Sequence, residues 1–203
     1  MGPDVWRNPD YYKNKYPKIK KWFWSFENQA KADLSAFQLR SNSTNRNLIQ
    51  RLQNILLIVG SVFGAAHAVA DDVGQRLSEL DLKVTRNESP EASDLEAQEP
   101  DLLLVITSTT GSGDLPEELV PFYSQLQDTP PRIAGLRFTV IVLGDSSYGE
   151  TFCGGGLALD AALEDIGAQR VAGPLQIDAI ETDEPETIAL DFINELLPSL
   201  QNQ

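Results

Sequence analysis

The stretch that decides the fold of this chain is LLLVITSTTGSGDLP, residues 102–116. It begins with a continuous apolar run, Leu102–Thr107, and ends in a loop of hydroxyl residues and glycines. Two further runs of the same kind are ILLIVG at Ile55–Gly60 and FTVIVL at Phe138–Leu143. Strands that are apolar throughout, rather than at every second residue, are typical of a parallel sheet covered by helices on both faces.

Segments with helical periodicity separate these runs. Residues 65–80 place Ala66, Val69, Val73 and Leu77 on one stripe. The other predicted elements are strands Leu82–Thr85 and Gln169–Asp178 (broken at Gly173–Pro174), a helical turn within Asn87–Pro100, and helices Leu115–Leu126, Gly154–Ile166 and Thr187–Leu197. Pro116 is expected in the first turn of its helix, where a missing N–H costs least. Five strands and five helices predict a doubly wound α/β fold.

Charge divides the chain near Asn54. Residues 1–53 hold ten Lys and Arg against four Asp and Glu, whereas residues 54–203 hold six against 26. We therefore expect a basic, aromatic N-terminal extension at 1–53 and one acidic domain at 54–203. Four interpretations of the extension stay open: a partner-binding or interfacial segment, a segment that folds back on the acidic domain, a poorly ordered tail, or upstream sequence included by a misplaced start. The acidity of the domain favours basic partners over nucleic acid or anionic membranes, although solubility alone also explains it.

Composition places the chain in the cytoplasm. The longest apolar run is far shorter than the roughly 20 residues of a transmembrane helix, so no transmembrane segment is expected. The first thirty residues contain no apolar stretch of secretory type. The single cysteine, Cys153, cannot form an internal disulfide, which fits a reducing compartment.

Ligands of such sheets bind at the carboxyl ends of the strands, so the loops after the three long runs are the candidate site. The first loop, Ser61–Ala66, leads from a strand directly into a helix, where unpaired N–H groups and the helix dipole attract a phosphate. It contains no Lys or Arg, and it matches neither the nucleoside-triphosphate loop nor the dinucleotide fingerprint. An ordinary strand-to-helix turn is the alternative interpretation.

The second and third loops carry further polar and aromatic groups. Four consecutive hydroxyl residues, 107–110, are expected to donate to a polar ligand, with glycines allowing close backbone approach. Asp114 is alternatively a cap for the helix that follows. In the third loop, residues 144–154, Tyr148 either stacks on a flat heterocycle or packs on the surface.

In their order and separations these loops resemble those of the flavodoxin family, and in particular of short-chain members related to MioC, YqcA and the flavin domain of sulfite reductase. The resemblance implies a five-stranded parallel sheet of order 2-1-3-4-5 and an FMN cofactor. The first loop would wrap the FMN phosphate, and the second would pass one edge and face of the ring. The third would cover the other face, with Tyr148 stacked on it. The implied cofactor-binding residues are Ser61, Val62, Phe63, Gly64, Ala65, Ala66, Thr107, Ser108, Thr109, Thr110, Gly111, Ser112, Gly113, Gly144, Asp145, Ser146, Tyr148, Phe152, Cys153 and Gly154.

Two features depart from the family pattern. Phe63, Ala65 and Ala66 stand where well-known flavodoxins carry hydroxyl or polar residues, which would remove two or three hydrogen bonds to the phosphate, each worth about 0.5–1.5 kcal/mol. Thr110 stands where several relatives have an aromatic ring that stacks on the flavin. We therefore expect weaker FMN binding than is typical of the family.

The resemblance implies a monomeric electron carrier that takes electrons from an NADPH-dependent flavodoxin reductase and passes them to acceptor proteins with basic faces. One alternative is an FMN-dependent reductase of a small substrate such as a quinone. Another is a flavin-free interaction module on the same fold. No spacing of residues indicates a metal site or a nucleophile–base pair, so no catalytic residues are assigned. His67 is expected on a helix surface, and Cys153 in packing beside the third loop.

Overall fold

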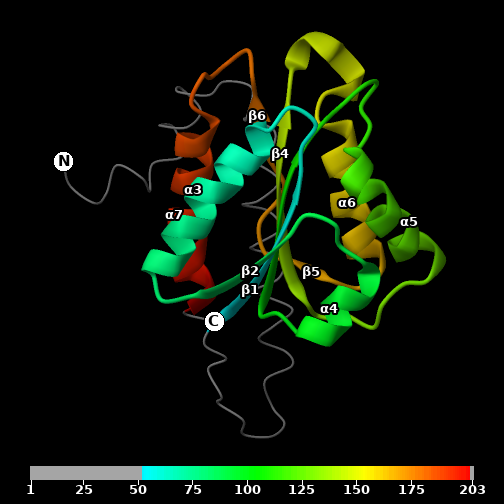
Figure 1. The fold of residues 1–203 in the computed structure, drawn as a ribbon, viewed down its shortest axis with the longest axis vertical. Helices are drawn as coiled ribbons and strands as arrows, with labels where there is room; N and C mark the ends of the chain where they lie inside the picture. Colours follow the sequence, from blue (N-terminus) through cyan, green and yellow to red (C-terminus); the bar gives the residue numbers. More distant parts are fainter. Residues whose placement is uncertain (1–51, 202–203) are drawn as a thin grey trace, which may run out of the picture. The chain divides into compact units, whose positions relative to one another are not determined.

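The computed structural model describes residues 52–201, so the predicted N-terminal extension lies outside the described residues except for its last two. A sheet forms the centre of the described part, and helices cover both of its faces (Figure 1). Helices α3 (Ala65–Glu79) and α7 (Pro185–Gln201) lie on one face. Helices α4 (Ala92–Gln98), α5 (Val120–Asp128) and α6 (Gly154–Asp165) lie on the other.

The sheet is parallel throughout and has the order β2-β1-β3-β4-β5, with β6 also paired to β4. Its strands are β1 (Asn54–Gly60), β2 (Lys83–Asn87), β3 (Leu102–Ser108), β4 (Arg137–Gly144), β5 (Gln169–Arg170) and β6 (Leu175–Asp178). The predicted doubly wound fold of order 2-1-3-4-5 is confirmed. The predicted break at Gly173–Pro174 divides the fifth strand position between β5 and β6.

Two hydrophobic cores explain why the central strands are apolar at nearly every buried position, with Thr107 of β3 and Thr139 of β4 as the polar exceptions. Alternate residues of β1 point to opposite faces: Leu57 packs in the core under α3 and α7, whereas Leu56 packs in the core under α4, α5 and α6. In β3, Leu104 and Val105 divide in the same way. A strand buried on both faces must be apolar on both, because an unpaired polar side chain there would lose its hydration.

Several predicted helix boundaries differ from the structure, and the last helix, predicted at Thr187–Leu197, runs over Pro185–Gln201. The helix predicted at Leu115–Leu126 begins only at Val120, after a short 3-10 turn at Glu117–Leu119. Pro116 lies outside it in extended backbone, with ψ 145°, and Pro121 occupies the first turn instead. A proline also disfavours helical backbone in the residue before it, which keeps Leu115 out of the helix.

The acidic segment 87–100 holds more helix than the single predicted turn. Helix α4 begins with a capping box in which the Glu91 side chain accepts a hydrogen bond from the backbone of Asp94. Asp94 Oδ2 in turn accepts a hydrogen bond from the Glu91 N–H at 2.9 Å. This reciprocal pair satisfies N–H groups that the first turn leaves without partners. Among residues 52–201 no helix has both the length and the apolar character needed to cross a membrane.

Three consecutive glycines allow α6 to begin against its neighbours. A Cβ atom on Gly154 would lie 2.9 Å from Gly113 O, and one on Gly155 would lie 2.7 Å from the backbone of Asp114. A Cβ atom on Gly156 would lie 2.4 Å from a methyl group of Val142. Any side chain here would therefore push α6 away from β4 and from the loop after β3.

We expect Gly156→Ala to destabilise the protein by about 1–3 kcal/mol, because the methyl group would overlap a fully buried valine. Urea denaturation followed by circular dichroism measures the change. Gly74→Ala is the matched control, since its Cβ atom would make an ordinary 3.6 Å contact with Leu57. That change should be neutral or stabilise by up to about 1 kcal/mol. Equal stability of both variants would contradict the close packing of α6.

Candidate functional site

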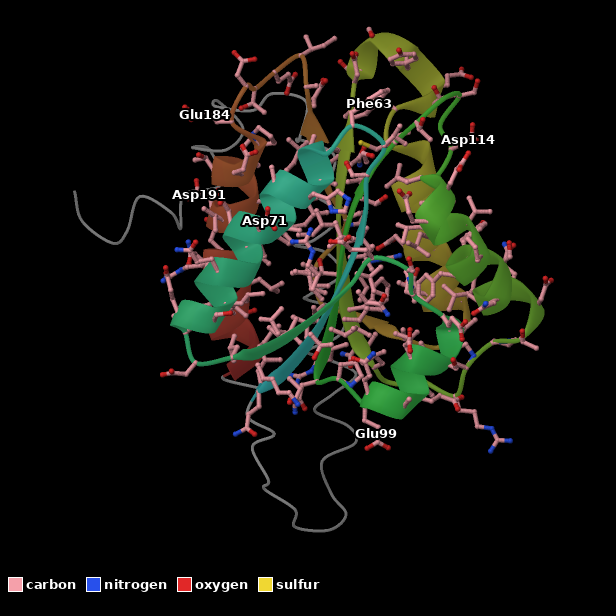
Figure 2. The ribbon with its side chains drawn as sticks, in the orientation of Figure 1. Phe63, Asp71, Glu99, Asp114, Glu184 and Asp191 are labelled. Carbon is pink, nitrogen blue, oxygen red and sulfur yellow. The ribbon has the colours of Figure 1, made fainter. Side chains whose placement is uncertain are left out.

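The loops after β1, β3 and β4 meet at the carboxyl edge of the sheet. Strand pairing continues to the end of each strand, with Gly60 opposite Thr107 and Ser108 opposite Leu143. The Thr109 N–H then donates to Leu143 O at 2.9 Å, which ties the second loop to β4. Figure 2 shows Phe63 and Asp114 near this end of the sheet and Glu99 at the opposite end. The predicted site residues of all three loops thus lie at one edge.

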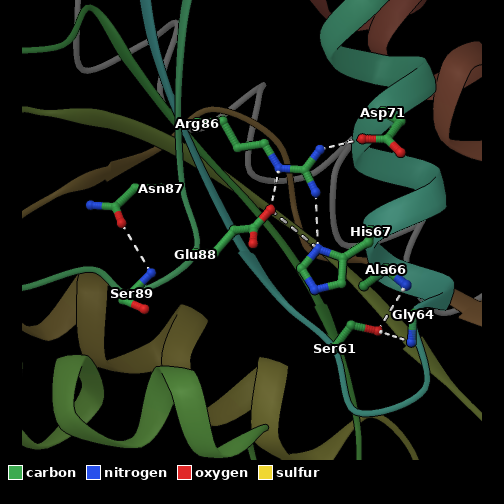
Figure 3. Close-up of polar contacts among 9 residues, drawn as sticks. All are labelled: Ser61, Gly64, Ala66, His67, Asp71, Arg86, Asn87, Glu88 and Ser89. Atoms are coloured by element: carbon green, nitrogen blue, oxygen red, sulfur yellow. Dashed lines mark hydrogen bonds and ion pairs between the residues drawn. The ribbon is translucent and has the colours of Figure 1, made fainter.

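The first loop closes around the hydroxyl group of Ser61. This buried side chain accepts hydrogen bonds from the Gly64 N–H at 3.0 Å and from the Ala66 N–H at 3.2 Å (Figure 3). Gly64 has a φ of 88°, a left-handed conformation that favours glycine, and α3 begins at the next residue. Within the described residues, no hydrogen bond is made by the N–H groups of Val62, Phe63 and Ala65. The loop therefore has free donors at the positive end of a helix.

Side chains of the first loop contribute little to this donor set. Phe63 is 94% exposed and Val62 is 46% exposed. Ala65 is exposed as well, and Ala66, in the first turn of α3, is buried. An anion at this loop would therefore meet backbone N–H groups held by Ser61, in a segment that has no cationic side chain.

The second loop is a closed turn between Thr110 and Asp114. Their backbones exchange two hydrogen bonds, Thr110 N–H to Asp114 O at 3.0 Å and Asp114 N–H to Thr110 O at 2.8 Å. Gly111 and Gly113 adopt left-handed backbone, with φ of 52° and 99°. Asp114 Oδ2 accepts a hydrogen bond from the Ser112 N–H at 3.3 Å. The alternative role of Asp114 as a helix cap is wrong, because the next helical turn begins only at Glu117.

The four hydroxyl residues 107–110 do not share one environment. Thr107 is fully buried, and its Oγ1 donates to Ser108 O at 3.1 Å, so its hydroxyl is satisfied within the protein. In contrast, Ser108 Oγ and Thr109 Oγ1 are buried without a hydrogen-bond partner among the described residues. An unsatisfied buried hydroxyl costs about 1–3 kcal/mol. Among the described residues the third such hydroxyl, Thr139 Oγ1, lies inside β4, whereas Ser108 and Thr109 lie at the strand end beside the candidate site.

The third loop contains two short 3-10 turns, together η4 (Ser146–Thr151), which a kink at Gly149 separates. Asp145 Oδ1 accepts hydrogen bonds from the Ser147 N–H at 2.8 Å and from Ser147 Oγ at 2.5 Å. The Tyr148 N–H donates to Asp145 O at 3.2 Å. The backbone that carries Tyr148 is thereby fixed while its ring remains 65% exposed, as a stacking side chain requires.

Sequence reasoning missed Asp178, which anchors the third loop. This buried residue at the end of β6 accepts two hydrogen bonds on Oδ1, from the N–H groups of Ser146 and Ile180, both at 3.0 Å. Strand pairing places Asp178 opposite Gly144, where the third loop begins. The only available signal was one carboxylate at the end of a broken strand, among 26 acidic residues of the domain.

The end of the third loop packs against the second. Phe152 is half-buried, and Cys153 is buried with a left-handed φ of 58°. Its Sγ lies 3.7 Å from Val142 O, as a weak donor. Burial, with a smaller contribution from the negative charge of Asp178, raises the pKa of Cys153 to about 12. The thiol is therefore protonated at neutral pH and serves in packing.

This arrangement fits a flavin nucleotide. The first loop offers backbone donors for a phosphate, and the second offers two unsatisfied hydroxyl groups and close backbone approach at its glycines. The third presents an exposed ring on a fixed turn. The predicted site residues whose side chains are buried and bonded within the protein are Ser61, Thr107 and Cys153.

Comparison with known proteins gives an independent test. A family model described as flavodoxin matches residues 57–191. Flavodoxin YqcA of Escherichia coli is 43% identical over 136 residues, covering 67% of this chain and 91% of YqcA. MioC of the same organism is 36% identical over 142 residues, covering 70% of this chain and 95% of MioC. The flavoprotein alpha-component of an NADPH sulfite reductase from Mannheimia succiniciproducens is 34% identical over 145 residues, covering 68% of this chain and 24% of that protein.

A solved structure extends this similarity to three dimensions. A cysteine-to-serine mutant of flavodoxin from Pseudomonas aeruginosa matches with a TM-score of 0.68 and 38% sequence identity, covering 73% of this chain and 99% of that one. The resemblance drawn from the three loops is thus confirmed.

We expect the buried thiol to lower stability at alkaline pH. The unfolded thiol ionises near pH 9.0 and the folded thiol near 12, so the unfolded state binds fewer protons between these values. The contribution of Cys153 to the free energy of unfolding is fully present below pH 9 and is lost as pH rises toward 12. Urea denaturation from about pH 8 to pH 11 should show a shallower decline for Cys153→Ala than for the wild type. Identical slopes would contradict the raised pKa.

Proposed function

This chain belongs to the flavodoxin family and is a flavodoxin-like electron carrier, and we propose that its flavin is one non-covalently bound FMN. The observation that carries the proposal is the first turn of α3. There the backbone of residues 61–66 is held by Ser61 and leaves three N–H groups free at the positive end of a helix. Such a turn binds a terminal phosphate, which FMN has and riboflavin lacks.

The ring of FMN would lie between the second and third loops. Ser108 Oγ and Thr109 Oγ1 would hydrogen-bond to its polar edge, which satisfies hydroxyl groups that are otherwise buried without partners. Tyr148 would stack on one face. On the other side the closed turn at residues 110–114 would present its backbone rather than an aromatic side chain.

FMN, when bound, supplies a ring that accepts and releases one or two electrons. The residues of this chain determine which redox state is favoured by placing dipoles and excluding water around that ring. The hydrogen bonds that fix both turns make these dipoles preorganised. The left-handed glycines at 111 and 113 allow the backbone of the second loop to approach closely without a Cβ atom in the way.

The proposed partners are proteins that exchange electrons with the flavin. An NADPH-dependent flavodoxin reductase would be the donor, and proteins with basic faces would be the acceptors. Support comes from the charge of residues 54–203, six Lys and Arg against 26 Asp and Glu, which attracts basic surfaces and speeds encounter. We place the carrier in the cytoplasm as a monomer, in keeping with its single, buried cysteine.

Flavin titration separates this proposal from its alternatives. We expect the purified full-length chain to take up one FMN and to acquire a flavin absorption spectrum. The loaded protein should not oxidise NADPH alone, but should be reduced once a flavodoxin reductase is added. A chain that takes up no flavin would contradict the proposal in favour of an interaction module. NADPH oxidation by the isolated protein, with a quinone as acceptor, would instead support a small-substrate reductase.

The stacking role of Tyr148 has its own test. Removing the ring in Tyr148→Ala should weaken FMN binding by about tenfold, since stacking contributes roughly 0.5–1.5 kcal/mol beyond the buried area. It should also shift the reduction potential of the flavin. Tyr148→Phe is the matched control and should retain the affinity, because the hydroxyl is not needed for stacking. Unchanged affinity in Tyr148→Ala, measured by fluorescence titration, would assign the ring to surface packing.

A further inference from the structure

A charged cluster lies directly behind the proposed phosphate loop (Figure 3). Arg86, near the end of β2, holds two residues of α3: its Nη2 lies 2.9 Å from His67 Nδ1, and its Nη1 contacts Asp71 Oδ1. Arg86 Nε also lies 2.9 Å from Glu88 Oε1. The same Glu88 oxygen lies 3.6 Å from His67 Nδ1. His67 is therefore bracketed by a cation and an anion on the same ring nitrogen.

The contact with Arg86 determines where neutral His67 carries its proton. A guanidinium group only donates hydrogen bonds, so Nδ1 must accept with its lone pair. The neutral ring then has its hydrogen on Nε2. In this state the three charged side chains around the ring, one arginine and two carboxylates, have a net charge of −1.

The protonated ring has a partner as well. With a hydrogen on Nδ1, the imidazolium can donate to Glu88 Oε1, while Arg86 keeps its contact with Asp71. Helix α7 packs on the same face of the sheet as α3 and carries Glu186 and Asp191, but no contact of either with the ring is found among the described residues. The cluster therefore accommodates both states of His67, and its net charge rises from −1 to 0 on protonation.

His67 lies where that charge acts on a bound phosphate. It is the third residue of α3 and follows Ala66, whose N–H is bonded to Ser61. A positive charge at a helix N-terminus is unfavourable by itself, and a phosphate bound there reverses that balance. Residues 61–66 have no Lys or Arg, and the surrounding domain is strongly acidic. His67 is thus the group of this turn that can supply positive charge.

We propose that His67 takes up a proton when the phosphate of FMN binds and thereby makes the site selective for FMN over riboflavin. The inference rests on the proposed FMN site. Coupling between two binding events is reciprocal, so lower pH should tighten FMN binding through His67. His67 acts as a specificity-determining residue behind the loop. Arg86 is the partner of the neutral ring, and Glu88 is the partner of the protonated ring.

Two measurements test the inference. The first is calorimetric titration with FMN at neutral pH in buffers of different ionisation enthalpy, which counts the protons taken up. The wild type should take up more protons than His67→Gln. Protons taken up by the FMN phosphate itself cancel in this comparison, because both proteins bind the same ligand. The second is the ¹⁵N signal of the chain's single histidine, which should move toward the imidazolium value on addition of FMN and not of riboflavin.

The affinities of the chain for FMN and for riboflavin give a further readout of the same coupling. The ratio of FMN to riboflavin affinity should fall about fivefold in His67→Gln near pH 6, the lower end of typical coupling, and less near pH 8. Glu88→Gln, which removes the partner of the protonated ring, should reduce the proton uptake in the same direction. The urea midpoint of each variant without flavin verifies that the fold is retained.

Equal proton uptake in the wild type and His67→Gln, with an unchanged FMN-to-riboflavin ratio, would overturn the inference and leave FMN binding intact. A wild-type chain that binds riboflavin as tightly as FMN would overturn it together with the proposed phosphate site. The two failures are therefore distinguishable in the same set of titrations.

Discussion

The close backbone contact between the start of α6 and the second loop is the constraint on which the site depends. Gly154 and Gly155 lie against Gly113 and Asp114 at distances that no side chain would permit. This contact fixes the separation of the second and third loops, and with it the space between them. Because protein interiors are close-packed and transmit strain, a methyl group added here would be felt at both loops.

The proposed binding of an anionic cofactor is compatible with a strongly acidic domain, because the two electrostatic effects act over different distances. The surplus of Asp and Glu over residues 54–203 is spread across the surface, where salt screens it beyond about 8–10 Å. The N–H groups of the first loop would act at hydrogen-bond distance on a single phosphate. On the proposed function, long-range charge would attract protein partners, while short-range backbone dipoles would bind the ligand. The charged cluster around His67 would act on the phosphate over a distance between these two ranges.

The parts that sequence reasoning predicted have local causes. A strand buried on both faces requires apolar residues at nearly every position, so the sequence alone predicts a buried strand at Leu102–Thr107. The start of α5 was misplaced because two prolines, Pro116 and Pro121, compete for the same role, and only packing decides between them. Asp178 was missed because its partner, Ser146, lies 32 residues earlier in the chain.

The sequence by itself determined the order of the elements, the edge of the sheet that carries the site and the residue types of its loops. Each of these follows from periodicity and from local backbone preference. Only the tertiary structure decided which hydroxyl groups remain unsatisfied, that Asp178 holds the backbone of Ser146, and that Arg86 reaches His67. Those outcomes depend on distances between segments far apart in the chain. The packing of helices on the sheet sets these distances, and no local sequence pattern predicts them.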